Sequence, residues 1–268
     1  MKQYLSLLKE IKEQGVWSEN RTGIRTKSLI GVMRKYDHAD GFPVVTTKKL
    51  AFKQVVGELL AFISGTTDVR DFHKFGCTVW DANLNAPSWV AKRKDEHDLG
   101  LVYGAMWRDF NGVDQLRNLV DKIKTDPDSR RLIVSAWNPE ALDDVCLPPC
   151  HVLFQVFIRE DKFLDLVFYQ RSNDSFLGVP FNITSYALLQ RILAQMTNYV
   201  PGILTHFMGD AHIYENHLEQ VDEQLTREPL PLPKLVISPF EDFENLTPSH
   251  FLLYDYKHHE AIKAEMAV

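Results

Sequence analysis

A β-hairpin between residues 151 and 169 constrains the fold of this chain more than any other segment. An apolar run at 151–158 is followed by four polar residues at 159–162 and by a second apolar run at 163–169. Two β-rich runs about a short polar turn predict an antiparallel hairpin. Because the start of one strand then lies beside the end of the other, we expect Cys150 and Arg171 to be neighbours. The hairpin would thus bring a thiol next to a guanidinium group.

Helical and strand-like patterns lie on both sides of this hairpin. Amphipathic spacing predicts helices at 4–14, 54–64, 114–124, 184–197 and 212–225, the last one following a turn at Gly209-Asp210. Runs rich in β-branched residues predict strands at 27–36, 44–47, 132–137, 203–207, 234–237 and 251–256, and the polar segment 82–98 is expected to be a surface excursion. No repeat or linker divides the chain, so we expect one domain over residues 1–268, of the α/β class and the α+β type.

The composition of the chain limits which kinds of binding partner and which cellular compartment we expect for it. The chain has 268 residues, 45% of them hydrophobic, and a net charge of −6 with a pI near 5.9. An acidic chain argues against nucleic acid as a main ligand. Three cysteines in a chain of this length give no disulfide framework, and no apolar run approaches the ~18 residues of a membrane span. We therefore expect a soluble cytoplasmic protein with no membrane partner.

Cys150 is the candidate nucleophile. The alternative is a buried cysteine that packs as a small hydrophobic residue, which is common for this residue type. A reactive thiolate needs a nearby positive charge to lower its pKa, and Arg171 would supply one. His151 should point to the other face of the strand, which disfavours a cysteine hydrolase with a Cys-His pair. Cys146 and Cys150 have no companion ligand pair at metal spacing, so no metal site is expected.

Several other polar residues leave two interpretations open. Glu58 stands within an apolar helical set and is either on a narrow polar face or a buried carboxylate that holds a proton network. Tyr103 is either a core aromatic or a hydroxyl directed at a site. Arg21 lies in the polar turn 20–23 and is either solvated or a phosphate ligand. Arg130 and Arg131, next to an apolar strand, suit a solvated pair, an anion site or a subunit contact.

Many segments in the same order resemble the thymidylate synthase family. They are NRTG at 20–23, GFPVVTTKK at 41–49, ELLAFISG at 58–65, TVWD at 78–81, LGLVYGAMWR at 99–108, DPDSRRLIVSAWN at 126–138, LPPCH around Cys150, YQRSND at 169–174, FLGVPFN at 176–182, GDAHIYENH at 209–217 and IKAEMAV at 262–268. The resemblance implies a mixed, twisted β-sheet packed against helices, with two such sheets back to back in a homodimer.

The resemblance also implies the residues of a site. The catalytic set is Cys150, Glu58, Tyr103, Asn182 and Asp174. The contacts to dUMP are Arg21, Gln170, Arg171, Ser172, Asn173, Asp174, Asn182, His212 and Tyr214, with Arg130 and Arg131 donated across the dimer interface. The contacts to folate are Val79, Trp80, Asp174, Leu177, Gly178, Phe181 and Ala267, and the carboxyl-terminal residues would close over the folate.

The reaction that the resemblance implies is reductive methylation of dUMP. Cys150 adds to carbon 6 of the pyrimidine, and carbon 5 then takes the one-carbon unit of 5,10-methylenetetrahydrofolate. Loss of the carbon-5 proton and hydride transfer yield dTMP and dihydrofolate. Asn182 would select uracil, since a side-chain amide can donate to the carbonyl at carbon 4 and accept from the ring N–H. Cytosine presents the opposite pattern.

The chain departs from the family pattern at a few positions around the folate pocket. Ala51 stands where many relatives have a histidine, Ala61 and Asn83 stand at tryptophan positions, Met208 replaces a glycine, and Asn173 replaces a small residue of another kind. A looser, wetter pocket would let water capture the methylene intermediate, so dUMP hydroxymethylase is the alternative enzyme. A catalytically silent nucleotide- or RNA-binding homologue is the alternative from another class.

Overall fold

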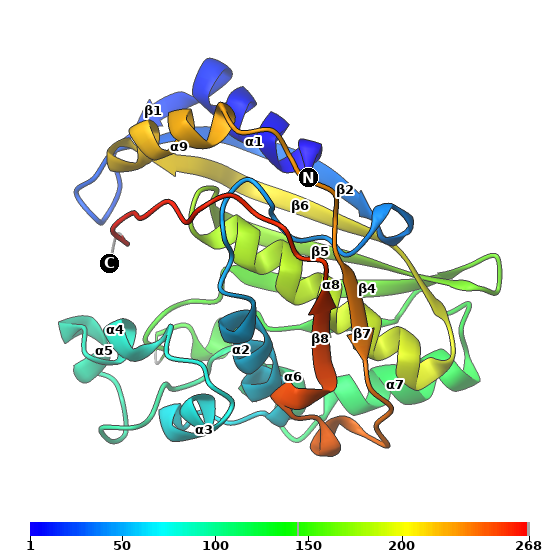
Figure 1. Ribbon diagram of the computed structural model, residues 1–268. Helices are drawn as coiled ribbons and strands as arrows, with labels where there is room; N and C mark the ends of the chain where they lie inside the picture. The colour runs from blue at the N-terminus through cyan, green and yellow to red at the C-terminus, as the bar shows by residue number, and fades with distance from the viewer. Residues whose placement is uncertain (144, 267–268) are drawn as a thin grey trace.

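The computed structural model describes residues 1–143 and 145–266 and is built on a six-stranded mixed sheet (Figure 1). Its strands are β1 (Val16–Ser18), β2 (Thr26–Asp37), β3 (Ile133–Ser135), β4 (His151–Arg159), β5 (Phe163–Asp174) and β6 (Val200–Tyr214). They lie in the order β1-β2-β6-β5-β4-β3, in which β5 and β6 are parallel and the other neighbours antiparallel. A separate ribbon pairs β7 (Lys234–Ile237) with β8 (Phe251–Tyr254). The predicted fold class, a mixed sheet packed with helices, is confirmed.

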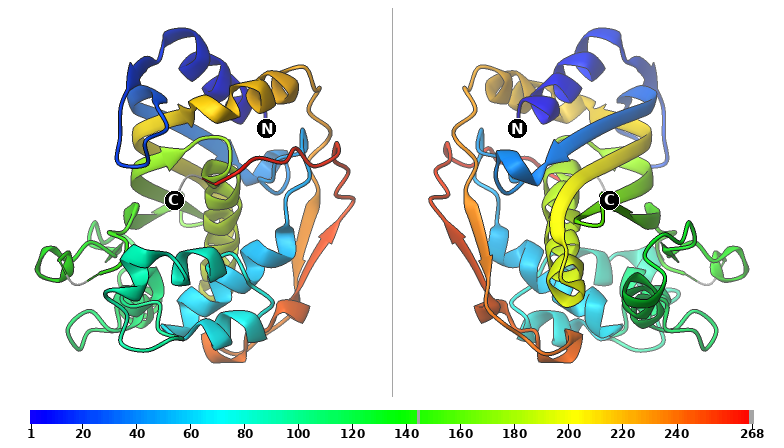
Figure 2. Two further views of the ribbon diagram at one scale, coloured as in Figure 1. Left: turned by 90° about the vertical axis from the view of Figure 1, so that its left-hand side faces the viewer. Right: turned by 90° about the vertical axis from the view of Figure 1, so that its right-hand side faces the viewer.

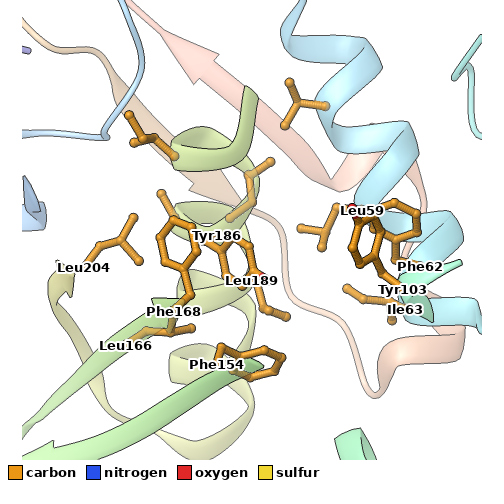
Figure 3. Close-up of a cluster of buried hydrophobic side chains, with 14 of the residues drawn as sticks. Leu59, Phe62, Ile63, Tyr103, Phe154, Leu166, Phe168, Tyr186, Leu189 and Leu204 are labelled. Carbon is orange, nitrogen blue, oxygen red and sulfur yellow. The ribbon is translucent and has the colours of Figure 1, made fainter. Parts of the chain in front are cut away.

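Helix α8 (Gly178–Thr197) connects the two parallel strands and lies between the sheet and the β7–β8 ribbon, as both views of Figure 2 show. The other helices are α1 (Lys2–Gln14), α2 (Phe52–Ser64), α3 (Val69–Lys74), α4 (Asp81–Leu84), α5 (Pro87–Val90), α6 (Tyr103–Arg108), α7 (Gln115–Thr125) and α9 (Leu218–Leu225). The core joins the sheet to α8 and α8 to α2 (Figure 3). At its centre the rings of Phe168 and Tyr186 stack with centroids 4.0 Å apart.

The local sequence explains the helices that were predicted. The apolar stripe of α1 is fully buried at Tyr4, Leu7, Leu8 and Ile11. Helix α2 ends at Gly65, whose φ of 77° is the left-handed conformation that glycine adopts without steric cost. Helix α7 starts at Asp114, whose carboxylate accepts a hydrogen bond from the backbone N–H of Arg117 at 2.9 Å.

The turn predicted at Gly209-Asp210 is wrong, as is the helix start predicted at residue 212. Strand β6 continues through both residues to Tyr214, and α9 begins only at Leu218. A Cβ on Gly209 would lie 2.7 Å from the Tyr169 hydroxyl and 2.9 Å from the Arg171 carbonyl oxygen. Glycine is required at residue 209 because β5 approaches the backbone closely there. The chain does not turn at this position.

Two further predictions are corrected. Residues 44–47 are buried but form no strand, because their polar groups bond to coil segments: the Thr46 carbonyl accepts from the backbone N–H of His259 at 2.9 Å. Segment 82–98 is not a featureless excursion. It contains α5 and most of α4, and it buries Trp89 and Leu84 against the core.

Candidate active site

Cys150 lies beside Arg171, at the end of the hairpin opposite its turn. The backbone N–H of Arg171 donates to the Cys150 carbonyl at 2.8 Å, and Nη2 of Arg171 is 4.0 Å from Sγ of Cys150. The same guanidinium donates to the carbonyls of Pro149 at 2.9 Å and Pro148 at 2.8 Å. These bonds fix both the cation and the loop that carries the thiol, and part of the guanidinium edge remains available to an anion.

Burial raises the pKa of the Cys150 thiol above its ordinary value, and the nearby charges of Arg171 and Arg21 oppose this only in part. Arg171 lies where its charge lowers the thiol pKa, as expected, but within one chain this does not fully offset the effect of burial. The charge of Arg21 acts to lower the pKa of both this thiol and Tyr214, so Arg21 lies in the neighbourhood of the same site.

Tyr103 and His151 pack behind the thiol. The hydroxyl oxygen of Tyr103 accepts a hydrogen bond from the backbone N–H of Cys150 at 3.1 Å, which makes this aromatic both a core residue and a group of the site. The ring of His151 stacks on the Tyr103 ring at 4.5 Å and is buried. As predicted from strand alternation, His151 points away from the thiol.

Glu58 projects from α2 towards Trp80, whose indole Nε1 donates to the carboxylate at 3.0 Å. Burial raises the pKa of Glu58 to about 7, against the lowering effect of that hydrogen bond. A carboxyl group poised near neutral pH can give and take a proton. Glu58 is half-buried, and its interpretation as a carboxyl group that holds a proton network is thus favoured over a solvated polar face.

Trp89 packs beside Trp80 in the core. Its ring lies edge-on to Trp80 with centroids 5.9 Å apart, and its side chain is 2% exposed. Although Asn83 stands at a tryptophan position of the family, a second tryptophan thus lies against Trp80. Ala61 is also fully buried within the core. Trp89 was not predicted as a core residue because it lies in a segment without periodicity.

The start of α8 gathers the residues expected to meet base and folate. Oδ1 of Asp174 accepts from the backbone N–H groups of Phe176 and Leu177 at 3.0 Å each. Gly178 lies against Asn182 and Asp174, since a Cβ at residue 178 would be 3.5 Å from Asn182 Oδ1. Leu177, Gly178, Phe181 and Asn182 are half-buried, whereas Val179 and Pro180 are buried. The half-buried set forms one rim of the site.

An amide network supports Asn182. Its Oδ1 accepts from Nε2 of Gln170 at 2.9 Å, and Oε1 of Gln170 is 3.0 Å from Nε2 of His206. Asn173 reaches the same histidine nitrogen through Oδ1 at 3.1 Å. His206 was not among the predicted site residues, because a polar residue at one strand position carries no local sign of such contacts.

His212 and Tyr214 lie on β6, where a spacing of two places both side chains on one face. The predicted helix that began at residue 212 would have put them on a helix, whereas both belong to the strand. Their rings are in edge-on contact with centroids 5.2 Å apart, and His212 pairs in register with Asp174 of β5. Ser172 pairs with Asp210 two residues earlier on β6. These residues continue the site along the β5–β6 seam.

Arg130 and Arg131 do not join the other arginines within one chain. They are exposed and precede β3, which pairs antiparallel with β4 so that Ile133 faces Gln155. Both arginines therefore lie near the Phe157–Arg159 end of β4, roughly 20 Å along the strand from Cys150. An arginine side chain does not span that distance, so another molecule would have to bring them to the thiol.

The carboxyl-terminal tail is docked on the body of the protein as far as it is described. Nε2 of His217 lies 2.7 Å from the Glu265 carbonyl oxygen, and Arg227 donates to the Glu260 carbonyl at 2.6 Å. Ala267, expected to contact folate, lies outside the described residues together with Val268.

Within residues 1–143 and 145–266, no cluster of three or more candidate metal ligands occurs, and no helix is long and apolar enough to cross a bilayer.

A thiol beside a fixed guanidinium, with a half-buried carboxyl group nearby and an amide network on the central strands β5 and β6, is an arrangement typical of enzymes in which a cysteine attacks an anionic substrate. Comparison with known proteins identifies the family. The thymidylate synthase family model matches residues 2–268. A thymidylate synthase of Mycoplasma mobile is 46% identical over 289 aligned residues, and one of Pseudomonas syringae pv. tomato is 38% identical over 323; each alignment covers 100% of both chains. The chain belongs to the thymidylate synthase family.

Proposed function

We propose that this protein converts dUMP to dTMP, with 5,10-methylenetetrahydrofolate as the donor of the one-carbon unit and of the hydride. The observation that carries the proposal is the placement of Cys150 against Arg171, 4.0 Å apart, in a chain whose full length matches the family. We assign to this chain's own side chains the binding of the nucleotide, the attack on it and the movement of its protons.

The nucleotide is bound along the β5–β6 seam. Arg21, Arg171 and Ser172 take the phosphate, because guanidinium groups bind its oxygens in pairs. Asn182 reads the base, with Gln170 and Asn173 behind it, and His212 and Tyr214 take the deoxyribose hydroxyl. The phosphate then lies beside Arg171, which leaves carbon 6 of the ring within reach of Cys150.

The rim at the start of α8 fits the folate ring system. Among the described residues, Oδ2 of Asp174 accepts no hydrogen bond, whereas Oδ1 is used by the backbone. A free carboxylate oxygen suits the N–H edge of a pterin. Val79, Leu177 and Phe181 are apolar and half-buried, and Trp80 closes the base of the rim. We place the folate here, with Gly178 alongside and Ala267 as part of the covering tail. When bound, the folate supplies the methylene carbon and the reducing hydride.

The protein's own groups act in a defined order. The Cys150 thiol loses its proton as its sulfur bonds to carbon 6, and the guanidinium of Arg171 stabilises the developing charge. Asn182 stabilises the enolate oxygen at carbon 4 by donating a hydrogen bond. Glu58 and Tyr103 move protons, including the one lost from carbon 5. Release of Cys150 as a thiolate completes the reaction, and Arg171 again stabilises the anion.

We propose further that the active protein is a symmetric homodimer built on the open face of the sheet. Met33, Phe207 and Tyr169 are each about 40% exposed and lie in register across β2, β6 and β5. A contiguous exposed apolar row on a sheet face indicates an interface. Back-to-back packing would bring Arg130 and Arg131 of one chain to the phosphate that is bound by the other chain. Within one chain the two arginines lie too far along β4 from Cys150 to reach that phosphate. We also propose that residues 1–268 form a single domain and that the protein is cytoplasmic.

The other functions considered are not favoured. The curated relatives at 46% and 38% identity are named thymidylate synthase, and Trp89 lies against Trp80 as a second tryptophan. Both findings favour hydride over water as the final reactant. A silent nucleotide- or RNA-binding protein would not need the thiol–guanidinium pair, and a net charge of −6 disfavours RNA.

Release of tritium from carbon 5 of labelled dUMP tests the proposal. In the presence of methylenetetrahydrofolate, the label should enter water at the rate of turnover, because carbon 5 loses its proton only after Cys150 has added. Binding of dUMP without release of the label would contradict the proposal and support a silent homologue.

A further inference from the structure

The orientation of the Asn173 amide is determined by the backbone around it. Its Nδ2 donates to the carbonyl oxygens of Gln170 at 3.0 Å and Asp210 at 3.1 Å. A backbone carbonyl only accepts, so the nitrogen must face these two groups. Oδ1 of Asn173 is thereby turned towards His206, and it lies 3.1 Å from the ring nitrogen Nε2.

The Gln170 amide is oriented by the same kind of constraint. Its Nε2 donates to the Ser172 carbonyl at 3.2 Å, so its Oε1 faces the other way and lies 3.0 Å from Nε2 of His206. Two amide oxygens thus converge on one ring nitrogen. That nitrogen must carry the hydrogen, because a bare nitrogen would repel both oxygens.

The environment keeps His206 in this single form. Its side chain is fully buried, and its ring stacks on Phe168 with centroids 4.0 Å apart. Burial, and to a lesser degree the charge of His151, hold the pKa of His206 well below its ordinary value, so the ring is neutral and has one hydrogen. Within the described part of the chain, Nδ1 meets no hydrogen-bond partner, which agrees with a hydrogen on Nε2.

The consequence reaches the residue that meets the base. With its oxygen held by His206, Gln170 presents an N–H to Oδ1 of Asn182 at 2.9 Å. If the Asn182 amide were reversed, its NH₂ group would face the NH₂ group of Gln170. Asn182 therefore keeps its nitrogen free to donate, and its oxygen retains a lone pair for a ring N–H.

We infer that His206 is a positioning residue for base selection, which fixes the amide orientation of Asn182 through Gln170 and thereby favours uracil over cytosine. The inference rests on the proposed function, in that it takes dUMP as the nucleotide bound. Asn173, one of the positions at which this chain departs from the family pattern, is the second anchor of the same histidine. His206 touches no reacting atom and acts only through its neighbours.

Equilibrium binding of dUMP and dCMP to three variants tests the inference. His206→Leu removes the N–H donor, leaves two buried oxygens without a partner and removes one of the two contacts that orient Gln170, so that only the longer bond to the Ser172 carbonyl opposes reversal; the ratio of the two dissociation constants should fall about tenfold or more. His206→Gln restores an N–H near the position of Nε2 and should retain the ratio. His38→Leu is the matched control, because buried His38 also contacts a glutamine oxygen, Gln190 Oε1 at 3.1 Å, in a pair not connected to Asn182. It should lose stability and keep the ratio.

A ratio unchanged in His206→Leu, or reduced equally in His38→Leu, would overturn the inference. A wild-type protein that bound neither nucleotide would instead refute the proposed function. Nitrogen-15 NMR of the wild-type histidines gives an independent test that needs no variant to fold. At pH 7 the ring of His206 should be neutral with hydrogen on Nε2, and hydrogen on Nδ1 or a charged ring would also overturn the inference.

Discussion

Nη2 of Arg171 lies 4.0 Å from Sγ of Cys150, and the same guanidinium is tied to the two proline carbonyls that precede the thiol. One side chain therefore positions the nucleophile and supplies the charge that stabilises its anion. Burial raises the pKa of the thiol, and the charge of Arg171 acts against this shift.

Loss of the Arg171 charge should slow alkylation of Cys150. Burial already raises the thiol pKa, and Arg171 opposes it, so Arg171→Gln should raise the pKa further and reduce the thiolate fraction at pH 8 by about tenfold. The iodoacetamide reaction rate, measured from pH 7 to 10, checks this. Arg171→Lys should have a smaller effect, and Arg159→Gln, at the far end of β4, none. An unchanged pH profile in Arg171→Gln would mean that the cation does not act on the thiol.

Glu58→Gln should make the protein more stable at alkaline pH and less active. The folded-state pKa of about 7 is raised above the ordinary value of 4.5, so the folded state binds more protons and wild-type stability falls as pH rises from about 5 to about 7. Above that range the ionisation of Glu58 lowers the free energy of unfolding by at most about 3.5 kcal/mol, since one pKa unit corresponds to about 1.4 kcal/mol. Gln avoids this cost and still accepts from Trp80.

Urea unfolding at pH 5 and pH 8 measures the effect of Glu58→Gln, with exposed Glu13→Gln as the control. The advantage of the variant should be present at pH 8 and small at pH 5, while turnover falls because a proton carrier is lost. Equal stability differences at both pH values would show that Glu58 is not held in its neutral form.

Mixing two inactive variants should restore activity. Cys150→Ser should lose turnover by orders of magnitude while it still binds dUMP, and Arg130→Ala/Arg131→Ala should lose phosphate affinity. A heterodimer of the two has one complete site, so an equal mixture, after subunit exchange, should recover about a quarter of wild-type activity. Recovery near zero, with exchange demonstrated, would show that Arg130 and Arg131 do not act across the interface on the site of the partner's Cys150.

Asn182→Asp should shift the preference from dUMP towards dCMP. A protonated carboxyl group presents both a donor and an acceptor, and an ionised one accepts from the cytosine amino group, so the fixed uracil pattern is lost. Competition between the two nucleotides in the binding assay measures the shift. A retained uracil preference would count against Asn182 as the reader of the base.

The hairpin and its neighbours could be predicted because strand alternation and turn chemistry are local. His151 to Ile158 and Phe163 to Tyr169 carry the pattern of two half-buried strands, and pairing alone then places Arg171 at Cys150. The buried stripes of α1 and α7 are equally local signals.

The errors arose where contacts distant in sequence decide the structure. Gly209 was predicted as a turn residue, but it is required by the close approach of β5. Residues 44–47 have strand composition, yet their neighbours are coil segments from the end of the chain. The function of His206 could not be predicted from the residues around it in sequence. It depends on the side-chain amides of Gln170 and Asn173, which lie on another strand of the sheet.

The identity of the nucleotide product tests the central proposal most directly. Mass spectrometry of a reaction containing the protein, dUMP and methylenetetrahydrofolate should show dTMP and an equal amount of dihydrofolate. Hydroxymethyl-dUMP with tetrahydrofolate, or dUMP recovered unchanged, would contradict it.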